Sequence, residues 1–279
     1  MKKIAKVTVS VVLLMAVLLF ASECAYIFVY PKEVEMNGVS YVFHREEKLR
    51  GFAIKHIDDN SNPEEMRTII IPDSINGTQV KFVGKQPIFL GMAELGIGYT
   101  HTERIYFPWT IRYIHKINFG LIDSYSDILE YMIFATNVSR NVFSVAKDFS
   151  DREIKCVITN WLYEEEKGQG TVYYKSYFER YYIPANISYM FNYDDSPNEG
   201  YFFIDLLEET GTLLEPPYPP QRTLYKFVGW YKDEACTAKW DFENDEVKIH
   251  FDEEGNCIYE EIKLYAGWEK ENWWDWFRK

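Results

Sequence analysis

The stretch "YKFVGWYKDEACTAKWDF", residues 225–242, decides how the carboxyl-terminal part of this chain folds. Its six aromatic side chains stand among charged ones and a single cysteine. Aromatic side chains at this density form either the wall of a binding site or the core of a small domain. The pattern favours a core, so we expect Phe227, Trp230 and Trp240 to be buried. We expect Gly229 to let two backbones approach closely.

The segments on either side of this stretch indicate short strands. Residues 185–207 predict two strands joined by the turn-rich loop "DDSPNEG". The segment "EPPYPPQR", residues 215–222, holds four prolines and predicts a stiff, extended spacer. Residues 246–268 predict two further strands, with "DEEGN" at the turn.

This part of the chain resembles the internalin-B-type B repeat, a small β-grasp-like module of bacterial surface proteins. The matching elements are "Y-x-F-x-GWY" at 225–231, "C-T-x-x-WDF" at 236–242 and "LYAGW" at 264–268. Gly267 departs from the family, which has a basic or similar polar residue at this position. The resemblance covers residues 183–269 and implies a spacer or adhesive module without catalytic residues.

The first half of the chain repeats one pattern. An isoleucine-rich strand is expected at 69–71 and another at 105–107, and each stops at a proline. A third, weaker copy lies at 129–145. Similar units at a spacing of tens of residues predict a solenoid, in which each unit buries its apolar face on the next. The side chains expected to point into this solenoid are Val80, Val83, Ile111 and Ile114.

The segment "IIIPDSINGTQVKFVG", residues 69–84, resembles the leucine-rich repeats of BspA-like bacterial surface antigens. The strands predicted before it, at 39–44 and 51–57, resemble the entry strands of such repeats. The chain departs from the family where His115 replaces a glycine and where "QPIF" carries one extra residue. The resemblance covers residues 37–149 and implies a short leucine-rich-repeat-like solenoid. Residues 150–182 are then expected to be bridging strands.

Residues 1–30 are expected to be a signal peptide or a membrane anchor. Three lysines precede an uncharged, apolar run at 7–22, and this pattern is typical of an export signal. The segment is either cleaved after Cys24, lipidated at Cys24 or retained as an anchor. Glu23 disfavours lipidation, because lipoprotein signals have a small residue at that place. Each alternative places the rest of the chain outside the cytoplasmic membrane.

Composition and motifs limit the kinds of ligand and cofactor that we expect the chain to bind. With 47% hydrophobic and 18% aromatic residues the chain can build real cores, and its net charge of −13 disfavours nucleic-acid binding. The four cysteines form no C-x-x-C pair, and the five histidines form no H-E-x-x-H, so no metal or other cofactor is expected. The sequence leaves open whether Cys236 and Cys257 form a disulfide. The tail at 270–279 carries three tryptophans, and is either docked or an exposed aromatic patch.

The sequence thus predicts a mainly β chain of the α+β class. After an N-terminal apolar helix, a short leucine-rich-repeat-like solenoid precedes a small β-grasp-like domain. The expected role is binding, adhesion or display at the bacterial cell surface, toward a protein or a glycan, without catalysis. The ligand-binding residues are not specified by the sequence. One alternative is a surface hydrolase that uses carboxylates such as Asp73, Glu103 or Asp123. The other alternative is a pure spacer.

Overall fold

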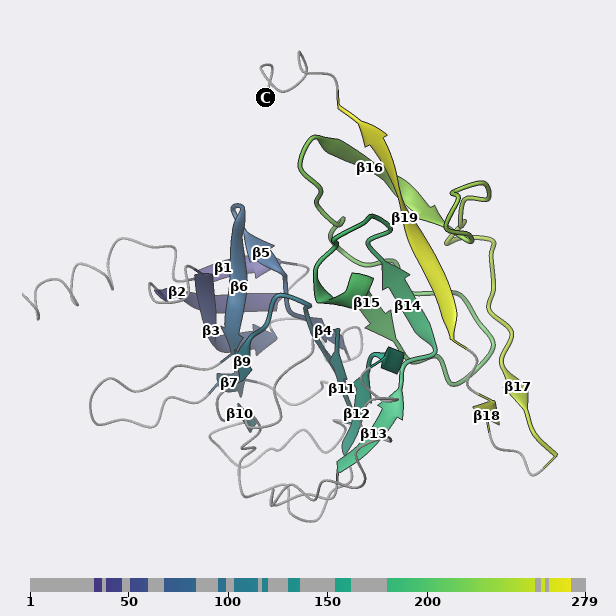
Figure 1. Ribbon diagram of the computed structural model, residues 1–279. Coiled ribbons are helices and arrows are strands. Elements are labelled where there is room, and N and C mark those ends of the chain that lie inside the picture. The colour runs from purple at the N-terminus through teal and green to yellow at the C-terminus, as the bar shows by residue number, and fades with distance from the viewer. Residues whose placement is uncertain are drawn as a thin grey trace, which may run out of the picture.

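The computed structural model describes residues 33–36, 39–46, 51–59, 68–83, 95–98, 103–114, 117–119, 130–135, 154–161, 180–253, 257–258 and 261–271. The described structure is mainly β, which confirms the predicted class (Figure 1). None of its helices is long and apolar enough to cross a membrane. The predicted leader at 1–30 lies outside the described residues, as does most of the predicted tail.

The first sheet contains eight strands. They are β1 (Glu33–Met36), β2 (Val39–Glu46), β3 (Gly51–Asp59), β5 (Ser74–Ile75), β6 (Thr78–Val83), β7 (Leu95–Gly98), β9 (Tyr113–Ile114) and β10 (Ile117–Phe119). β2 and β3 pair antiparallel at the place of the two predicted entry strands. β5 and β6 form a hairpin whose turn residues Asn76 and Gly77 have φ angles of 48° and 75°. Two positive φ angles are typical of a type I′ turn.

The second sheet contains five parallel strands in chain order. They are β4 (Thr68–Ile70), β8 (Arg104–Phe107), β11 (Tyr131–Phe134), β12 (Ile154–Ile158) and β13 (Arg180–Pro184). Pro72 and Pro108 follow β4 and β8, as the repeated pattern predicts. Val80 and Ile111, which were expected to point inward, are fully buried. The burial of Val83 and Ile114 falls outside the described part. β12 and the start of β13, which are described strands within 150–182, extend this sheet where bridging strands were expected.

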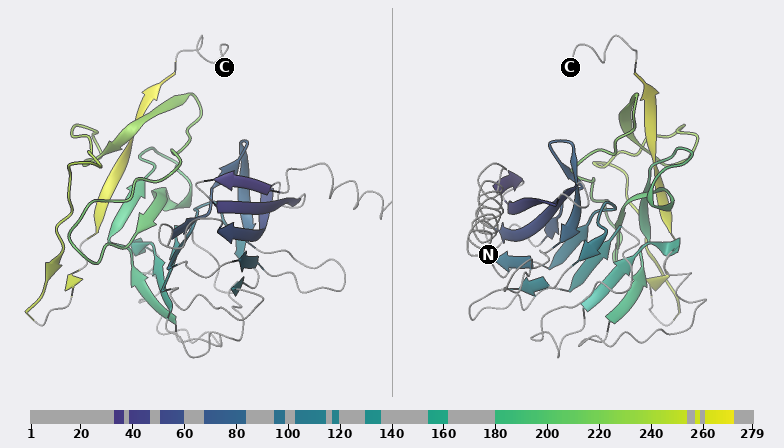
Figure 2. Two further views of the ribbon diagram at one scale, coloured as in Figure 1. Left: turned by 180° about the vertical axis from the view of Figure 1, so that it is seen from behind. Right: turned by 60° about the vertical axis from the view of Figure 1, so that its left-hand side comes forward.

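Side chains on both faces of this parallel sheet are buried, as in parallel sheets generally. Aligned residues on one face include Ile69, Ile105 and Met132. On the same face Phe107 and Phe134 stack at a centroid distance of 4.5 Å. The opposite face belongs to the core cluster of the carboxyl-terminal sheet, through Tyr106, Tyr131, Ile133 and Val157. The parallel sheet therefore lies between the two other sheets (Figures 1 and 2).

The carboxyl-terminal sheet has the strand order β15 (Tyr201–Asp205), β14 (Ile187–Met190), β19 (Ile262–Lys270) and β16 (Tyr225–Tyr231). The central strands β14 and β19 are parallel, and each outer strand is antiparallel to its neighbour. A three-residue 3-10 helix, η3 (Asn198–Gly200), stands in the loop before β15. The hairpin of β17 (His250–Phe251) and β18 (Cys257–Ile258) precedes β19.

The quoted aromatic stretch belongs to the core. Trp230 is 2% exposed and Trp240 is 9% exposed, which confirms the core prediction for both. Phe227 is only half-buried and meets Trp230 edge-on, at a centroid distance of 5.1 Å. Cys236 is a free thiol, so it forms no disulfide with Cys257.

Two glycines face each other across β16 and β19. Gly229, with a φ angle of 132°, is the register partner of Gly267. A Cβ atom on Gly229 would lie 2.3 Å from Cε of Lys239, and one on Gly267 would lie 2.2 Å from the ring of Tyr231. We expected a second backbone to lie close to Gly229. The nearest atoms there belong instead to a side chain, that of Lys239.

Candidate functional site

A polar network joins the parallel sheet to the carboxyl-terminal sheet. Arg104, Tyr131 and Lys155 occupy register positions on β8, β11 and β12. All three converge on Glu208, which follows β15. Tyr131 donates its hydroxyl hydrogen to Glu208, Lys155 Nζ lies 3.1 Å from Glu208 Oε1, and Arg104 Nη2 lies 3.9 Å from Glu208 Oε2. The Arg104 guanidinium stands 4.4 Å from the centroid of the Tyr131 ring.

Asp205 is the buried centre of this junction. Its Oδ1 atom accepts hydrogen bonds from the Tyr106 hydroxyl at 2.7 Å and from the Leu206 backbone N–H at 2.8 Å. Arg104 Nη1 lies 3.7 Å from the same carboxylate and donates to the Leu206 carbonyl at 2.9 Å. Burial raises the pKa of Asp205, against the lowering effect of these hydrogen bonds. Burial also raises the pKa of Tyr106 well above its usual value.

The ionisable groups of the junction are engaged with one another. Burial and the hydrogen bonds from Tyr131 and Lys155 oppose each other at Glu208, and the net effect lowers the pKa of this carboxyl. Hydrogen bonds to Tyr131 and Glu208 raise the pKa of Lys155 despite the opposing effect of burial. Groups paired in this way hold two sheets together, so we assign the junction a structural role.

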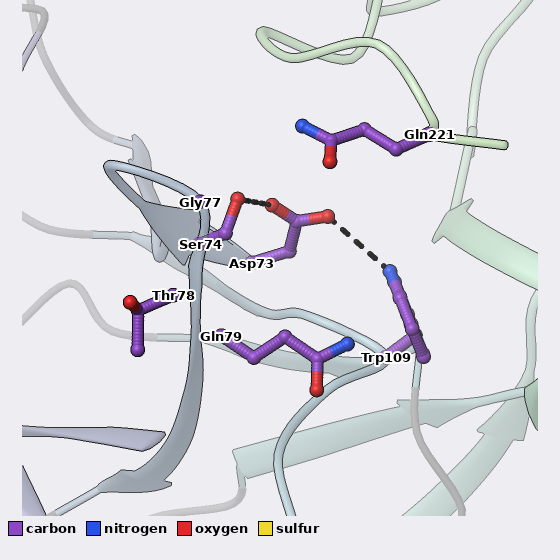
Figure 3. A pocket seen from close by; sticks show the side chains of 7 residues that line it. All are labelled: Asp73, Ser74, Gly77, Thr78, Gln79, Trp109 and Gln221. Carbon is purple, nitrogen blue, oxygen red and sulfur yellow. Dashed lines mark hydrogen bonds between the residues drawn. The ribbon is translucent and has the colours of Figure 1, made fainter. Parts of the chain in front are cut away.

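A pocket of about 440 Å³ lies elsewhere, beside the hairpin of β5 and β6 (Figure 3). Its side-chain lining consists of Asp73, Ser74, Thr78, Gln79, Trp109 and Gln221, together with the backbone of Gly77. These residues come from three segments: the hairpin region, the turn after β8, and the proline-rich segment before β16. A volume of this size is within the usual range of small-molecule sites.

Backbone hydrogen bonds fix Asp73 at the mouth of the hairpin. The carbonyl of Asp73 accepts the Val80 N–H at 2.8 Å and the Thr110 hydroxyl at 3.2 Å. Thr110 is buried, and its single hydroxyl hydrogen is shared between the Asp73 carbonyl and the nearer Val80 carbonyl at 2.6 Å. The turn after β8 is therefore tied to the hairpin on the first sheet, and this tie brings Trp109 beside Asp73.

The Asp73 carboxylate is only 9% exposed, yet it lines the pocket. Ser74 Oγ donates to Oδ1 at 2.8 Å, and Trp109 Nε1 donates to Oδ2 at 3.3 Å (Figure 3). Burial raises the pKa of Asp73, while these two hydrogen bonds act in the opposite direction. The carboxylate thus keeps a fixed orientation and lone pairs that neither Ser74 nor Trp109 occupies.

Of the three carboxylates considered from the sequence, the structure places only Asp73 in this pocket. Glu103 is not among its lining residues, and Oε1 of Glu103 lies 3.8 Å from Nε of Arg104. Asp123 lies outside the described residues. Within the described residues, no group of three or more His, Cys, Asp or Glu side chains could hold a metal ion.

Of the residues that line the pocket, sequence reasoning singled out only Asp73, and it missed the side chains of Ser74, Thr78, Gln79, Trp109 and Gln221. Trp109 follows the proline that ends the second repeat strand, so its position after Pro108 could have marked it. Gln221 carries no such signal, because its place beside Asp73 depends on how two distant segments pack.

Comparison with known proteins identifies part of the chain. The model of the Listeria-Bacteroides repeat domain, a bacterial surface repeat, matches residues 189–266. A protein of Evansella cellulosilytica named "Putative membrane protein" is 41% identical over 61 residues, which are 22% of this chain and 8% of the relative. A second protein of that organism, "Putative Gly-rich membrane protein", is 39% identical over 61 residues, 22% of this chain and 6% of the relative. The matched part thus spans less than a tenth of either relative.

Proposed function

We propose that this chain is an exported bacterial cell-surface protein that binds a ligand and catalyses no reaction. The Listeria-Bacteroides repeat at 189–266 supports a surface location, and so do the names of the two relatives. Residues 1–30 serve as signal peptide, lipoprotein signal or membrane anchor in this proposal, with residues 31–279 outside the cytoplasmic membrane.

The finer assignments of both halves belong to the same proposal. Parallel strands in chain order are what a leucine-rich-repeat-like solenoid requires, and the order of β4, β8 and β11 supports the BspA-like resemblance at 37–149. The order β15-β14-β19-β16 with a parallel central pair supports a β-grasp-like, internalin-B-type module at 183–269.

The observation that carries ligand binding is the Asp73 pocket, which holds one carboxylate fixed by two hydrogen bonds. Glycoside hydrolysis as a rule uses two carboxyl groups on either side of the scissile bond. Among the described residues that line the pocket, Asp73 is the only carboxylate, and this supports binding over hydrolysis.

A pure spacer is the less favoured alternative. A spacer needs only folded modules, and a mostly buried carboxylate such as Asp73 costs free energy that an apolar side chain would not. Polar groups held in place around a pocket are instead expected where a ligand is oriented.

Two measurements test the proposal. Protease added to intact cells should digest the chain beyond Pro31, and digestion only after lysis would rule out a surface location. The full chain should also be retained on immobilised surface glycans or proteins, with the ligand recovered unchanged. Release of a cleaved product by the purified chain would favour the hydrolase instead.

A further inference from the structure

We propose that the pocket around Asp73 binds a neutral sugar, with Trp109 as its stacking platform and Asp73, Gln79 and Gln221 as its hydrogen-bond partners. This inference rests on the proposed surface-binding function, because it names the ligand class of the same pocket. The resemblances to repeat families assign no role to the residues of this pocket.

The lining matches the two kinds of surface that a sugar presents. A pyranose ring has apolar C–H faces, which pack against a flat aromatic ring, and a rim of hydroxyl groups that both donate and accept. Trp109 supplies the aromatic ring, which Figure 3 draws edge-on. The carboxamides of Gln79 and Gln221 can each donate and accept, as hydroxyl groups require.

Asp73 supplies the strongest acceptor of the pocket. A carboxylate has about four lone-pair sites. Ser74 and Trp109 each engage one oxygen atom, at 2.8 Å and 3.3 Å. The remaining lone pairs can accept sugar hydroxyl groups, and hydrogen bonds to a carboxylate in a poorly solvated place are strong ones. The orientation that Ser74 and Trp109 impose means that the acceptor is preorganised for its ligand.

The charge of the lining argues for a neutral ligand. Of the described residues that line the pocket, only Asp73 has an ionisable side chain, and its two oxygen atoms already accept from Ser74 and Trp109. A cationic ligand would meet no second carboxylate here. An anionic ligand would meet no cation, and Asp73 would repel it. Uncharged amide and hydroxyl groups make up the rest of the polar lining.

The pocket is complete only when both halves of the chain are docked. Gln221 belongs to the matched repeat domain, whereas Asp73 and Trp109 belong to the repeat units before it. The Tyr218 hydroxyl donates to the Ile71 carbonyl at 3.3 Å, and this bond fixes the proline-rich segment beside Asp73. Sites between two modules are a common location for ligand pockets.

The experiment titrates the full chain with methyl glycosides of glucose, galactose, mannose and N-acetylglucosamine. The protein is kept in a detergent without a sugar headgroup, and binding is measured by calorimetry. We expect at least one glycoside to bind with a dissociation constant on the order of 1 mM or tighter. Gln221→Ala, at an exposed position without a buried contact to lose, should weaken this binding at least fivefold. Asp73→Asn should weaken it at least tenfold.

The matched control is Thr223→Ala, two positions away on the same segment, exposed and outside the pocket lining. It should bind as the unaltered chain does. If Asp73→Asn does not fold, Gln79→Ala takes its place, with the same expected direction.

Three results would overturn the sugar site. They are the absence of binding by every glycoside, binding that Gln221→Ala and Asp73→Asn leave unchanged, and Asp73-dependent binding of methylammonium in place of a sugar. Each of these leaves the proposed function standing if protease still reaches the chain on intact cells. A chain protected from protease on intact cells would overturn the proposed function itself.

Discussion

The Tyr106 hydroxyl donates a 2.7 Å hydrogen bond to Asp205, across 99 positions of sequence. Tyr106 lies on β8 of the parallel sheet, and Asp205 ends β15 of the carboxyl-terminal sheet. The ring of Tyr106 also stacks on Phe203, with 5.2 Å between centroids. Polar and apolar contacts thus coincide at one place, and they make the two sheets a single packed unit.

Replacing Tyr106 with Phe should destabilise the chain by about 1–3 kcal/mol, because the buried Asp205 loses a donor while the ring is retained. Denaturant melts of the full chain measure this change. The control is Tyr231→Phe, since no described residue accepts a hydrogen bond from the Tyr231 hydroxyl, and its cost should stay within about 0.5 kcal/mol. Equal midpoints for the two variants would contradict the role given to the Tyr106–Asp205 bond.

Replacing Trp240 with Ala should cost about 3–5 kcal/mol, because a large side chain that is 9% exposed leaves a cavity. Trp240→Phe should cost much less, since the indole N–H is buried without a hydrogen-bond partner among the described residues. Denaturant melts of both variants give the comparison. A loss for Phe as large as that for Ala would show that the indole N–H has a partner after all.

Local chemistry made several elements predictable from the sequence. Pro72 and Pro108 marked the ends of two parallel strands, because proline cannot donate to a sheet ladder. An Asn-Gly pair such as Asn76–Gly77 is a turn signal, because both residues tolerate a positive φ angle. In each case the signal lies within a few residues of the feature it predicts.

Contacts between distant faces were not predictable in the same way. Tyr106 and Tyr131 looked like ordinary strand residues, and only the docking of the last sheet buries them together. The candidate pocket was hidden for the same reason, since Asp73 and Gln221 meet only through tertiary packing.

Replacing Gly267 with Ala should destabilise the carboxyl-terminal sheet by about 1–3 kcal/mol, as overpacked sites do. The added Cβ would lie 2.2 Å from the ring of Tyr231, the last residue of the neighbouring strand β16. Gly211→Ala is the control, because nothing lies within 4 Å of its added Cβ atom. Thermal melts should separate the two variants by several degrees, and coinciding melts would refute the predicted clash.

The stability of the chain should fall steeply with rising pH in the alkaline range. Burial raises the pKa of Tyr201 to about 12, and the nearby Glu261 adds to the shift. Burial also raises the pKa values of Tyr106 and Tyr189 well above their usual value. In the unfolded chain a tyrosine ionises near pH ~10. Above that pH the unfolded chain holds fewer protons than the folded chain, so the free energy of unfolding decreases as pH rises.

Tyr201→Phe tests this dependence, because the variant removes one tyrosine whose pKa rises on folding. Between about pH 10 and pH 12 its free energy of unfolding should fall less steeply than that of the unaltered chain. Between about pH 7 and pH 9 tyrosines keep their protons in both states, so the two curves should there be offset by a constant amount. The constant offset reports the lost hydrogen bond of 3.3 Å from the Tyr201 hydroxyl to Glu261. Denaturant melts at each pH give the two curves, and parallel curves through the alkaline range would mean that Tyr201 ionises as easily in the folded chain as in the unfolded one.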